Sequence, residues 1–134
     1  MSRRMRRPDT VKIDISRGDW ILVKKHLTAG ETRAIFAQML GPDQQINRLN
    51  VGVSKVAGYL LDWSFTDADD QPIRIKDQSD DVLRSILNNL DADTFLELTA
   101  AIDAHEAAMA QEREREKNGP DGAIGSSAIS PSVV

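Results

Sequence analysis

The feature that most constrains the fold is an apolar stripe in the segment from Leu49 to Phe65. Bulky apolar side chains recur there at steps of four, three, four and three residues. They are Leu49, Val53, Val56, Leu60 and Trp63. Because an α-helix has 3.6 residues per turn, this spacing places them all on one helical face. A face this wide needs cover from several neighbours, so the stripe predicts a central helix, over residues 45–64, in a small domain.

Two short strands are predicted ahead of this helix. From Thr10 to Ile15 apolar and polar residues alternate, which is the signature of a half-buried strand. The segment Trp20 to Lys25 has strand character, and turn residues near Arg17-Gly18 separate the two. We therefore expect a hairpin over residues 10–25, packed on helices because an isolated hairpin is marginal in water. The extended piece Ile73 to Ile75 is a candidate third strand.

Three further helices are predicted from capping signals and apolar spacing. Thr28 and Glu31 match a capping box that opens a helix over 28–40. Three aspartates begin a helix over 79–90, where the helix dipole favours negative charge. Its apolar face consists of Val82, Leu83, Ile86, Leu87 and Leu90.

The last helix begins at Asp91 as N-cap and runs over residues 91–117, ending in alternating Glu and Arg. Together these elements predict an α+β fold that is mainly α. A hairpin packs on about four helices in a single domain over residues 10–118.

Composition places both ends of the chain outside this domain. Only 40% of the 134 residues are hydrophobic and 4% are aromatic, so part of the chain is not in a core. Residues 1–9 form a basic arm and residues 119–134 a small-residue tail, and we expect both to be flexible. The chain has no cysteine, which suits a reducing cytoplasm, and no apolar run approaches the ~18 residues of a membrane span.

Charge is distributed unevenly along the chain. Residues 1–25 carry eight Lys or Arg and three Asp, whereas the remainder carries nine basic and eighteen acidic residues. The arm lacks aromatic residues for stacking on bases, and phosphate would be repelled by an acidic body. Nucleic acid is therefore an unfavourable partner. The other interpretations are that the arm binds an acidic protein surface or that it is a solvated terminus.

No pattern in the sequence points to catalysis, a cofactor or a metal. The two histidines, His26 and His105, lack the spacing of a metal-binding pair, and there is no nucleophile elbow or glycine-rich phosphate loop. The acidic turn that starts at Asp67 resembles a calcium loop, but Pro72 and Gln78 stand where that loop needs Gly and Glu. We expect a protein without enzymatic activity, cofactor or metal.

The order of features over residues 18–117 does resemble one family. The matching features are Trp20, Thr28 to Arg33, Tyr59 to Phe65, Pro72, and a last helix whose apolar part ends near Ala110. The most specific part is the run LLDWSFTD before the proline. This combination is similar to the small tail assembly chaperones of long-tailed bacteriophages; the basic arm and the tail are not part of the likeness.

The resemblance implies a helper that binds the tape measure protein and keeps this long helical chain soluble while the tail tube assembles. It implies action in the host cell cytoplasm, absence from the mature virion, and the tail tube protein as a second candidate partner, and it leaves a homo-oligomer open. Two alternatives also stay open: a structural subunit of the virion, such as a tail or head–tail connector component, and a small regulatory binding module.

A chaperone for an amphipathic helix needs an exposed apolar groove with a polar rim. The candidates for such a surface come from the apolar stripes of the central and last helices. They are Tyr59, Trp63, Phe95, Ile102 and Met109. The alternative for all five is burial in the core, and for Trp63 we expect substantial burial because it ends a five-member stripe.

Overall fold

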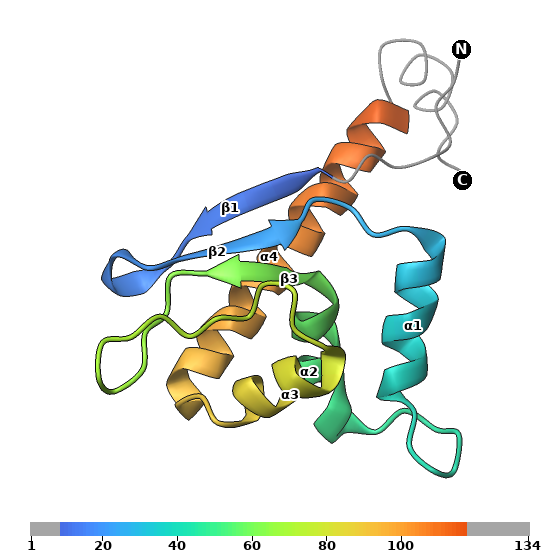
Figure 1. Cartoon of the computed structure of the whole chain (residues 1–134). Helices are drawn as coiled ribbons and strands as arrows, with labels where there is room; N and C mark the ends of the chain where they lie inside the picture. Colours follow the sequence, from blue (N-terminus) through green and yellow to red (C-terminus); the bar gives the residue numbers. More distant parts are fainter. Residues whose placement is uncertain (1–8, 118–134) are drawn as a thin grey trace, which may run out of the picture. The chain divides into compact units, whose positions relative to one another are not determined.

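The computed structural model describes residues 9–117, and within them the chain forms a three-stranded antiparallel sheet and four α-helices (Figure 1). This confirms the predicted α+β, mainly α fold. The predicted flexible arm and tail lie outside the described residues, apart from Asp9. The elements in order are β1 (Thr10–Asp14), a 3₁₀ turn η1 (Ser16–Gly18), β2 (Trp20–Lys24), α1 (Ala29–Met39), α2 (Arg48–Tyr59), β3 (Leu60–Trp63), α3 (Asp80–Asn88) and α4 (Ala92–Lys117).

The N-terminal hairpin is confirmed. β1 and β2 are antiparallel, with Thr10 opposite Lys24 and Asp14 opposite Trp20. The connection turns at Arg17 and Gly18, which have φ values of 61° and 75°. Glycine adopts this left-handed conformation freely, so Gly18 suits the turn. The turn brings β2 into the middle of the sheet, between β1 and β3.

The predicted central helix is wrong in its last part. α2 ends at Tyr59, and Leu60–Trp63 is the strand β3, in which Trp63 lies opposite Ile21 of β2. β2 has a row of backbone donors and acceptors on the side away from β1, and pairing with β3 satisfies them. Only Leu60 and Trp63 of the stripe lie in this segment, and a short apolar run of this kind fits a buried strand as well as a helix.

The candidate third strand at Ile73–Ile75 is also wrong, because β3 takes that place in the sheet. After β3 the chain turns back on itself: an isolated bridge joins Thr66 and Pro72, and the Ile73 N–H donates to the Phe65 carbonyl at 3.0 Å. This loop brings Ile73 beside Phe65, near the end of the hairpin.

The core lies between the sheet and helices α2, α3 and α4. Each of these elements contributes buried side chains to one cluster. The strands supply Ile21, Val23, Leu60 and Trp63, and the helices supply Val56, Tyr59, Leu83, Leu87, Leu98 and Ile102. Of the predicted apolar stripe, Val56, Leu60 and Trp63 are buried and Val53 is half-buried, although a helix and a strand share these residues.

Helix α1 begins with the predicted capping box and packs on α2. The Glu31 N–H donates to the Thr28 hydroxyl at 3.1 Å, and the Glu31 carboxylate accepts from the Thr28 N–H at 2.8 Å. Ile35 is the buried residue of this helix, and Gly58 of α2 leaves the space that its side chain occupies. Glycine is needed there because a Cβ would overlap the Ile35 side chain.

Residues up to Ile102 form one compact unit, and a second begins at Asp103. The boundary falls inside α4. The described residues of the second unit, 103–117, are helical throughout. In the part of the chain that the structure describes, no helix has the length and apolar character needed to cross a membrane.

Candidate functional site

Most of the side chains selected for a partner surface lie in the core. Tyr59, Trp63 and Ile102 are 6%, 5% and 0% exposed, so a partner that docks on the folded unit cannot reach them. Phe95 is half-buried and packs against the same cluster. Met109, also half-buried, lies in the part of α4 beyond Ile102. Tyr59, Trp63 and Ile102 are therefore excluded from a docking surface on the folded unit, which must include other residues.

Trp63 is held in place on two sides. Its indole N–H donates to the Ile73 carbonyl at 2.8 Å, and its ring stacks on Phe65 with 4.6 Å between centroids. The expectation that Trp63 is substantially buried is confirmed. Its contacts attach the loop after β3 to the core, which determines where Phe65 and Ile73 lie.

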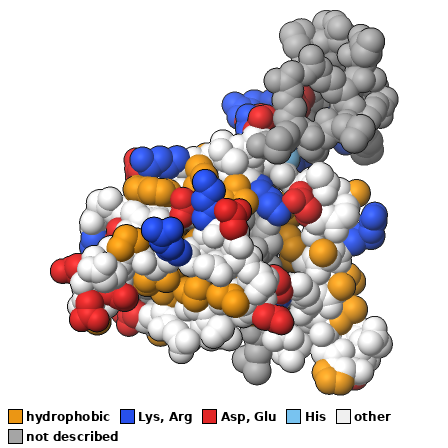
Figure 2. All heavy atoms as spheres, viewed as in Figure 1, with side chains coloured by type: hydrophobic (Ala, Val, Ile, Leu, Met, Phe, Trp, Pro, Cys, Tyr) orange, Lys and Arg blue, Asp and Glu red, His pale blue; other side chains and the backbone are white. Residues whose placement is uncertain are grey.

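Large apolar side chains are exposed at four positions of the described chain, each between 42% and 64% accessible: Phe36, Ile46, Val82 and Leu96. Val82 differs from the others because Ile86 follows it one turn on in α3, and Leu90 follows just after the helix ends at Asn88. We call these three residues the α3 stripe. Ile86 and Leu90 are half-buried. Figure 2 shows a row of hydrophobic side chains over α3 and the segment before it.

This stripe leads into a groove of about 530 Å³ at the end of the hairpin. The groove is lined by η1, the loop after β3, the α3–α4 connection and the first turns of α4. Its apolar lining is Phe65, Ala68, Ile73 and Leu90, and its charged lining is Arg17, Asp19, Asp67, Asp91, Asp93 and Glu97. We call it the hairpin groove. Five carboxylates against one guanidinium make it strongly acidic.

Local backbone geometry places two of these carboxylates. Asp67 Oδ1 accepts hydrogen bonds from the N–H groups of Asp69 and Gln71, at 2.8 and 3.0 Å, which closes the turn after β3. Asp91 Oδ2 accepts from the N–H and hydroxyl of Thr94, at 3.2 and 3.3 Å, as the predicted N-cap of α4. Both residues therefore serve the fold through one oxygen each.

Glu97 joins α4 to the hairpin turn. Its two carboxylate oxygens accept from the Ser16 N–H and from the Ser16 hydroxyl, each at 2.8 Å. The hydrogen bond from the Ser16 backbone, and after it the one from the hydroxyl, lower the pKa of Glu97. The nearby Arg17 charge acts in the same direction. The ionised carboxylate is thus the form that fixes this wall of the groove.

We expect Glu97→Gln to destabilise the protein at neutral pH and to have a smaller effect in acid. A carboxyl whose pKa is lower in the folded state stabilises fully above its unfolded pKa, and this contribution disappears as the pH falls through the folded pKa. Urea midpoints of both proteins between pH 7 and pH 3 should therefore converge towards the acid end. A gap between the midpoints that stays constant with pH would show that Glu97 acts without its charge.

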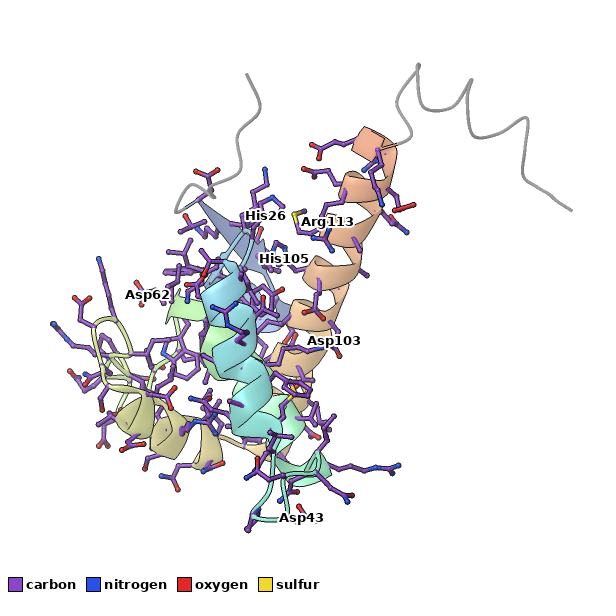
Figure 3. The ribbon with its side chains drawn as sticks, turned by 90° about the vertical axis from the view of Figure 1, so that its right-hand side faces the viewer. His26, Asp43, Asp62, Asp103, His105 and Arg113 are labelled. Carbon is purple, nitrogen blue, oxygen red and sulfur yellow. The ribbon has the colours of Figure 1, made fainter. Side chains whose placement is uncertain are left out.

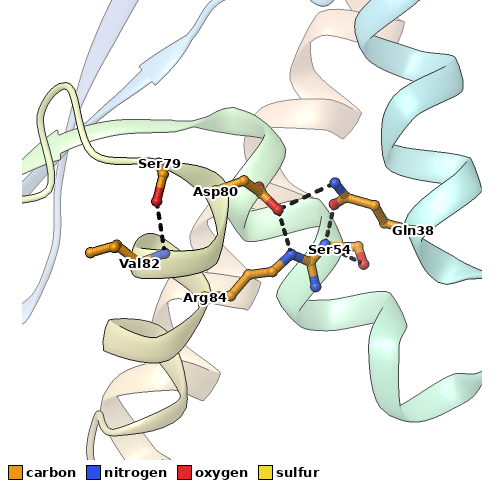
Figure 4. Close-up of polar contacts among 6 residues, drawn as sticks. All are labelled: Gln38, Ser54, Ser79, Asp80, Val82 and Arg84. Carbon is orange, nitrogen blue, oxygen red and sulfur yellow. Dashed lines mark hydrogen bonds and ion pairs between the residues drawn. The ribbon is translucent and has the colours of Figure 1, made fainter.

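A separate polar cluster links three helices (Figure 4). The Arg84 guanidinium donates to Asp80 Oδ2 at 2.9 Å, to the Ser54 hydroxyl at 3.1 Å and to the Gln38 amide oxygen. Gln38 in turn donates to Asp80 at 3.3 Å. Ser54 is fully buried, and this hydrogen bond satisfies its hydroxyl. Each member has a partner inside the cluster, so we assign it to holding α1, α2 and α3 together.

The histidines and acidic residues form no metal centre in the described chain. No group of three or more His, Cys, Asp or Glu side chains in residues 9–117 has an arrangement that could hold a metal ion. His26 is half-buried after β2, and His105 is 7% exposed in α4 (Figure 3). The groove carboxylates are therefore interpreted as charged lining beside the apolar residues of the hairpin groove.

The sequence indicates the local role of several residues that line the hairpin groove, but it does not indicate that they lie together. It assigned Asp91 to a helix cap and Asp67 to a turn, and both assignments are confirmed. It also placed Val82, Ile86 and Leu90 on one face of a helix. The missing information was that the turn of the hairpin lies beside the start of α4, and the Ser16–Glu97 contact spans 81 residues of sequence.

Comparisons with known proteins give no match. No protein-family model matches this chain, and no curated protein or solved structure is significantly similar to it.

Proposed function

We propose that this protein is a phage tail assembly chaperone, a non-enzymatic helper that binds the tape measure protein and promotes assembly of the tail tube. The proposal takes its identity from the resemblance over residues 18–117. Its support in the structure is the α3 stripe, in which Val82 is exposed and Ile86 and Leu90 are half-buried, and which adjoins the hairpin groove at Leu90.

Such a stripe is suited to a helical partner. An amphipathic helix lays its apolar face against a complementary apolar strip and leaves its polar face in water. A tape measure protein is a long helical chain whose apolar faces are uncovered until the tube surrounds it. A small protein that covers one such face would keep the chain soluble, and would leave when tube subunits replace it in the host cytoplasm.

The direct test is co-expression of this protein with the tape measure protein of the same phage. We expect soluble tape measure protein only when this chain is present, and recovery of both in a pull-down. Because an apolar contact supplies the main driving force, part of the binding should survive high salt, and calorimetry should show a negative heat-capacity change. The matched control is the same co-expression with an unrelated acidic protein of similar size.

The presence or absence of this protein in purified virions is the observation that can contradict the proposal. A chaperone should be missing from them. Stoichiometric presence in virions together with failure to bind the tape measure protein would replace the proposal with the structural-subunit alternative.

A further inference from the structure

We propose that the hairpin groove is the docking site for a Lys- or Arg-bearing flank of an amphipathic helix, while the α3 stripe receives the apolar face of that helix. This rests on the proposed function only in naming the tape measure protein as the source of the helix. The groove itself is described by contacts within residues 9–102 and would select the same peptide chemistry from any source.

The apolar part of the site is continuous. Leu90 belongs both to the α3 stripe and to the lining of the groove, where Phe65 and Ile73 adjoin it. Val82, at the other end of the stripe, is 42% exposed. A helix that lies along α3 therefore meets apolar side chains from Val82 to the groove, where the acidic rim begins.

Three carboxylates of the hairpin groove have oxygens that accept no hydrogen bond from the described residues. The contacts of Asp67 use Oδ1 and those of Asp91 use Oδ2, so the second oxygen of each carboxylate accepts no hydrogen bond from the described residues. The Asp93 carboxylate, in the first turn of α4, also accepts none within the described chain. Carboxylates with free oxygens at the edge of an apolar surface recognise ammonium and guanidinium groups.

Charge also selects the kind of flank that the groove accepts. Arg17 supplies the single positive charge of the groove, against five carboxylates. An acidic flank would be repelled there and a basic flank attracted, so a basic flank of the helix should lie at the groove while its apolar face lies along α3. Nucleic acid is a poor occupant for the same reason, because its phosphates carry the wrong sign.

The test measures binding of two synthetic peptides to the full chain by fluorescence anisotropy. Both form the same amphipathic helix with a leucine face; one has Lys at its flanks and the other Glu. We expect the Lys peptide to bind about tenfold more tightly at low salt. The difference in affinity between the two peptides should become smaller at about 1 M salt, because the Debye length is then only about 3 Å and charge interactions are screened.

A matched pair of variants locates the site. Asp67→Asn removes a groove charge, and Asp43→Asn removes a charge from the loop between α1 and α2 (Figure 3). Both aspartates are exposed and accept an N–H from the residue two positions on, at 2.8 and 3.1 Å, a role that asparagine retains. Asp67→Asn combined with Asp93→Asn should weaken Lys-peptide binding about five- to tenfold, whereas Asp43→Asn should leave it unchanged.

A second pair tests the apolar part. Val82→Ser should weaken both peptides equally, because it removes apolar contact without changing charge. Leu96→Ser is the control, since Leu96 is also exposed and does not line the groove. The proposal would be overturned if the Asp67→Asn/Asp93→Asn and Asp43→Asn variants bound the Lys peptide with equal affinity. It would also be overturned if the intact chain showed no preference for the Lys peptide over the Glu peptide.

The basic arm of this chain is the competing occupant. If its four arginines filled the groove, replacing Arg3, Arg4, Arg6 and Arg7 by Gln would raise Lys-peptide affinity about tenfold; that result would overturn the proposal. The outcomes are separable from those of the chaperone proposal. Both proposals are supported if the groove variant loses the preference for the Lys peptide and the intact chain solubilises the tape measure protein. If the intact chain does not solubilise the tape measure protein, only the chaperone role is contradicted.

Discussion

Trp63→Ala is expected to lower the free energy of unfolding by about 3–5 kcal/mol, the usual range for removal of a large buried aromatic side chain. Trp63 is 5% exposed, stacks on Phe65 and donates its indole N–H to the Ile73 carbonyl. The substitution leaves a cavity under the sheet and deprives the Ile73 carbonyl of its donor. It should also loosen the loop that supplies Phe65 and Ile73 to the hairpin groove. Urea denaturation gives the size of the effect.

The second tryptophan provides the control. Trp20 is half-buried, and its ring lies under the Lys12 ammonium group at 5.0 Å from the ring centroid. Trp20→Ala therefore removes a side chain of the same size from a more exposed site and should cost clearly less. Near-neutral stability of Trp63→Ala together with loss of tape measure binding would return Trp63 to the partner surface.

Gly58→Ala is expected to destabilise the protein by about 1–3 kcal/mol, although alanine is the better helix former. An added Cβ would overlap Cγ1 and Cδ1 of Ile35, the residue that buries α1 against α2. The Ile35 side chain is 8% exposed, so it has little free space into which to move. The cost should appear in urea midpoints and as a weaker attachment of α1, measured by hydrogen exchange of its amide groups.

Gly52 is the matched control because it lies in the same helix. A Cβ there would meet the Phe95 ring at 3.5 Å, which is an ordinary contact. Gly52→Ala should therefore be neutral or stabilising by up to about 1 kcal/mol. Adding Ile35→Ala to Gly58→Ala should cost less than the two single effects together, because the smaller side chain at position 35 leaves space that the Cβ added at position 58 can occupy. Equal stability of Gly58→Ala and Gly52→Ala would disprove the close approach of the two helices.

The sequence by itself determined the elements whose signals are local. The alternation of Thr10 to Ile15 and the turn at Arg17-Gly18 produce the hairpin, and the capping residues Thr28 and Asp91 start their helices. These features depend on residues a few positions apart, so they can be read before any tertiary contact is known. The apolar stripes also identified many of the side chains that become buried, such as Val56, Leu87 and Ile102, although Val82 of the same pattern is exposed.

Only the tertiary structure decided the state of Leu60–Trp63 and the location of the groove. The periodicity of that segment fits a helix, yet pairing with β2 satisfies the backbone groups of both strands, and that gain depends on a neighbour about 40 residues away. The hairpin groove is a second case, because Ser16, Asp67 and Glu97 meet only after the sheet and helices pack. A site assembled from distant segments has no local pattern, since each residue already has a local role in a turn, a cap or a helix.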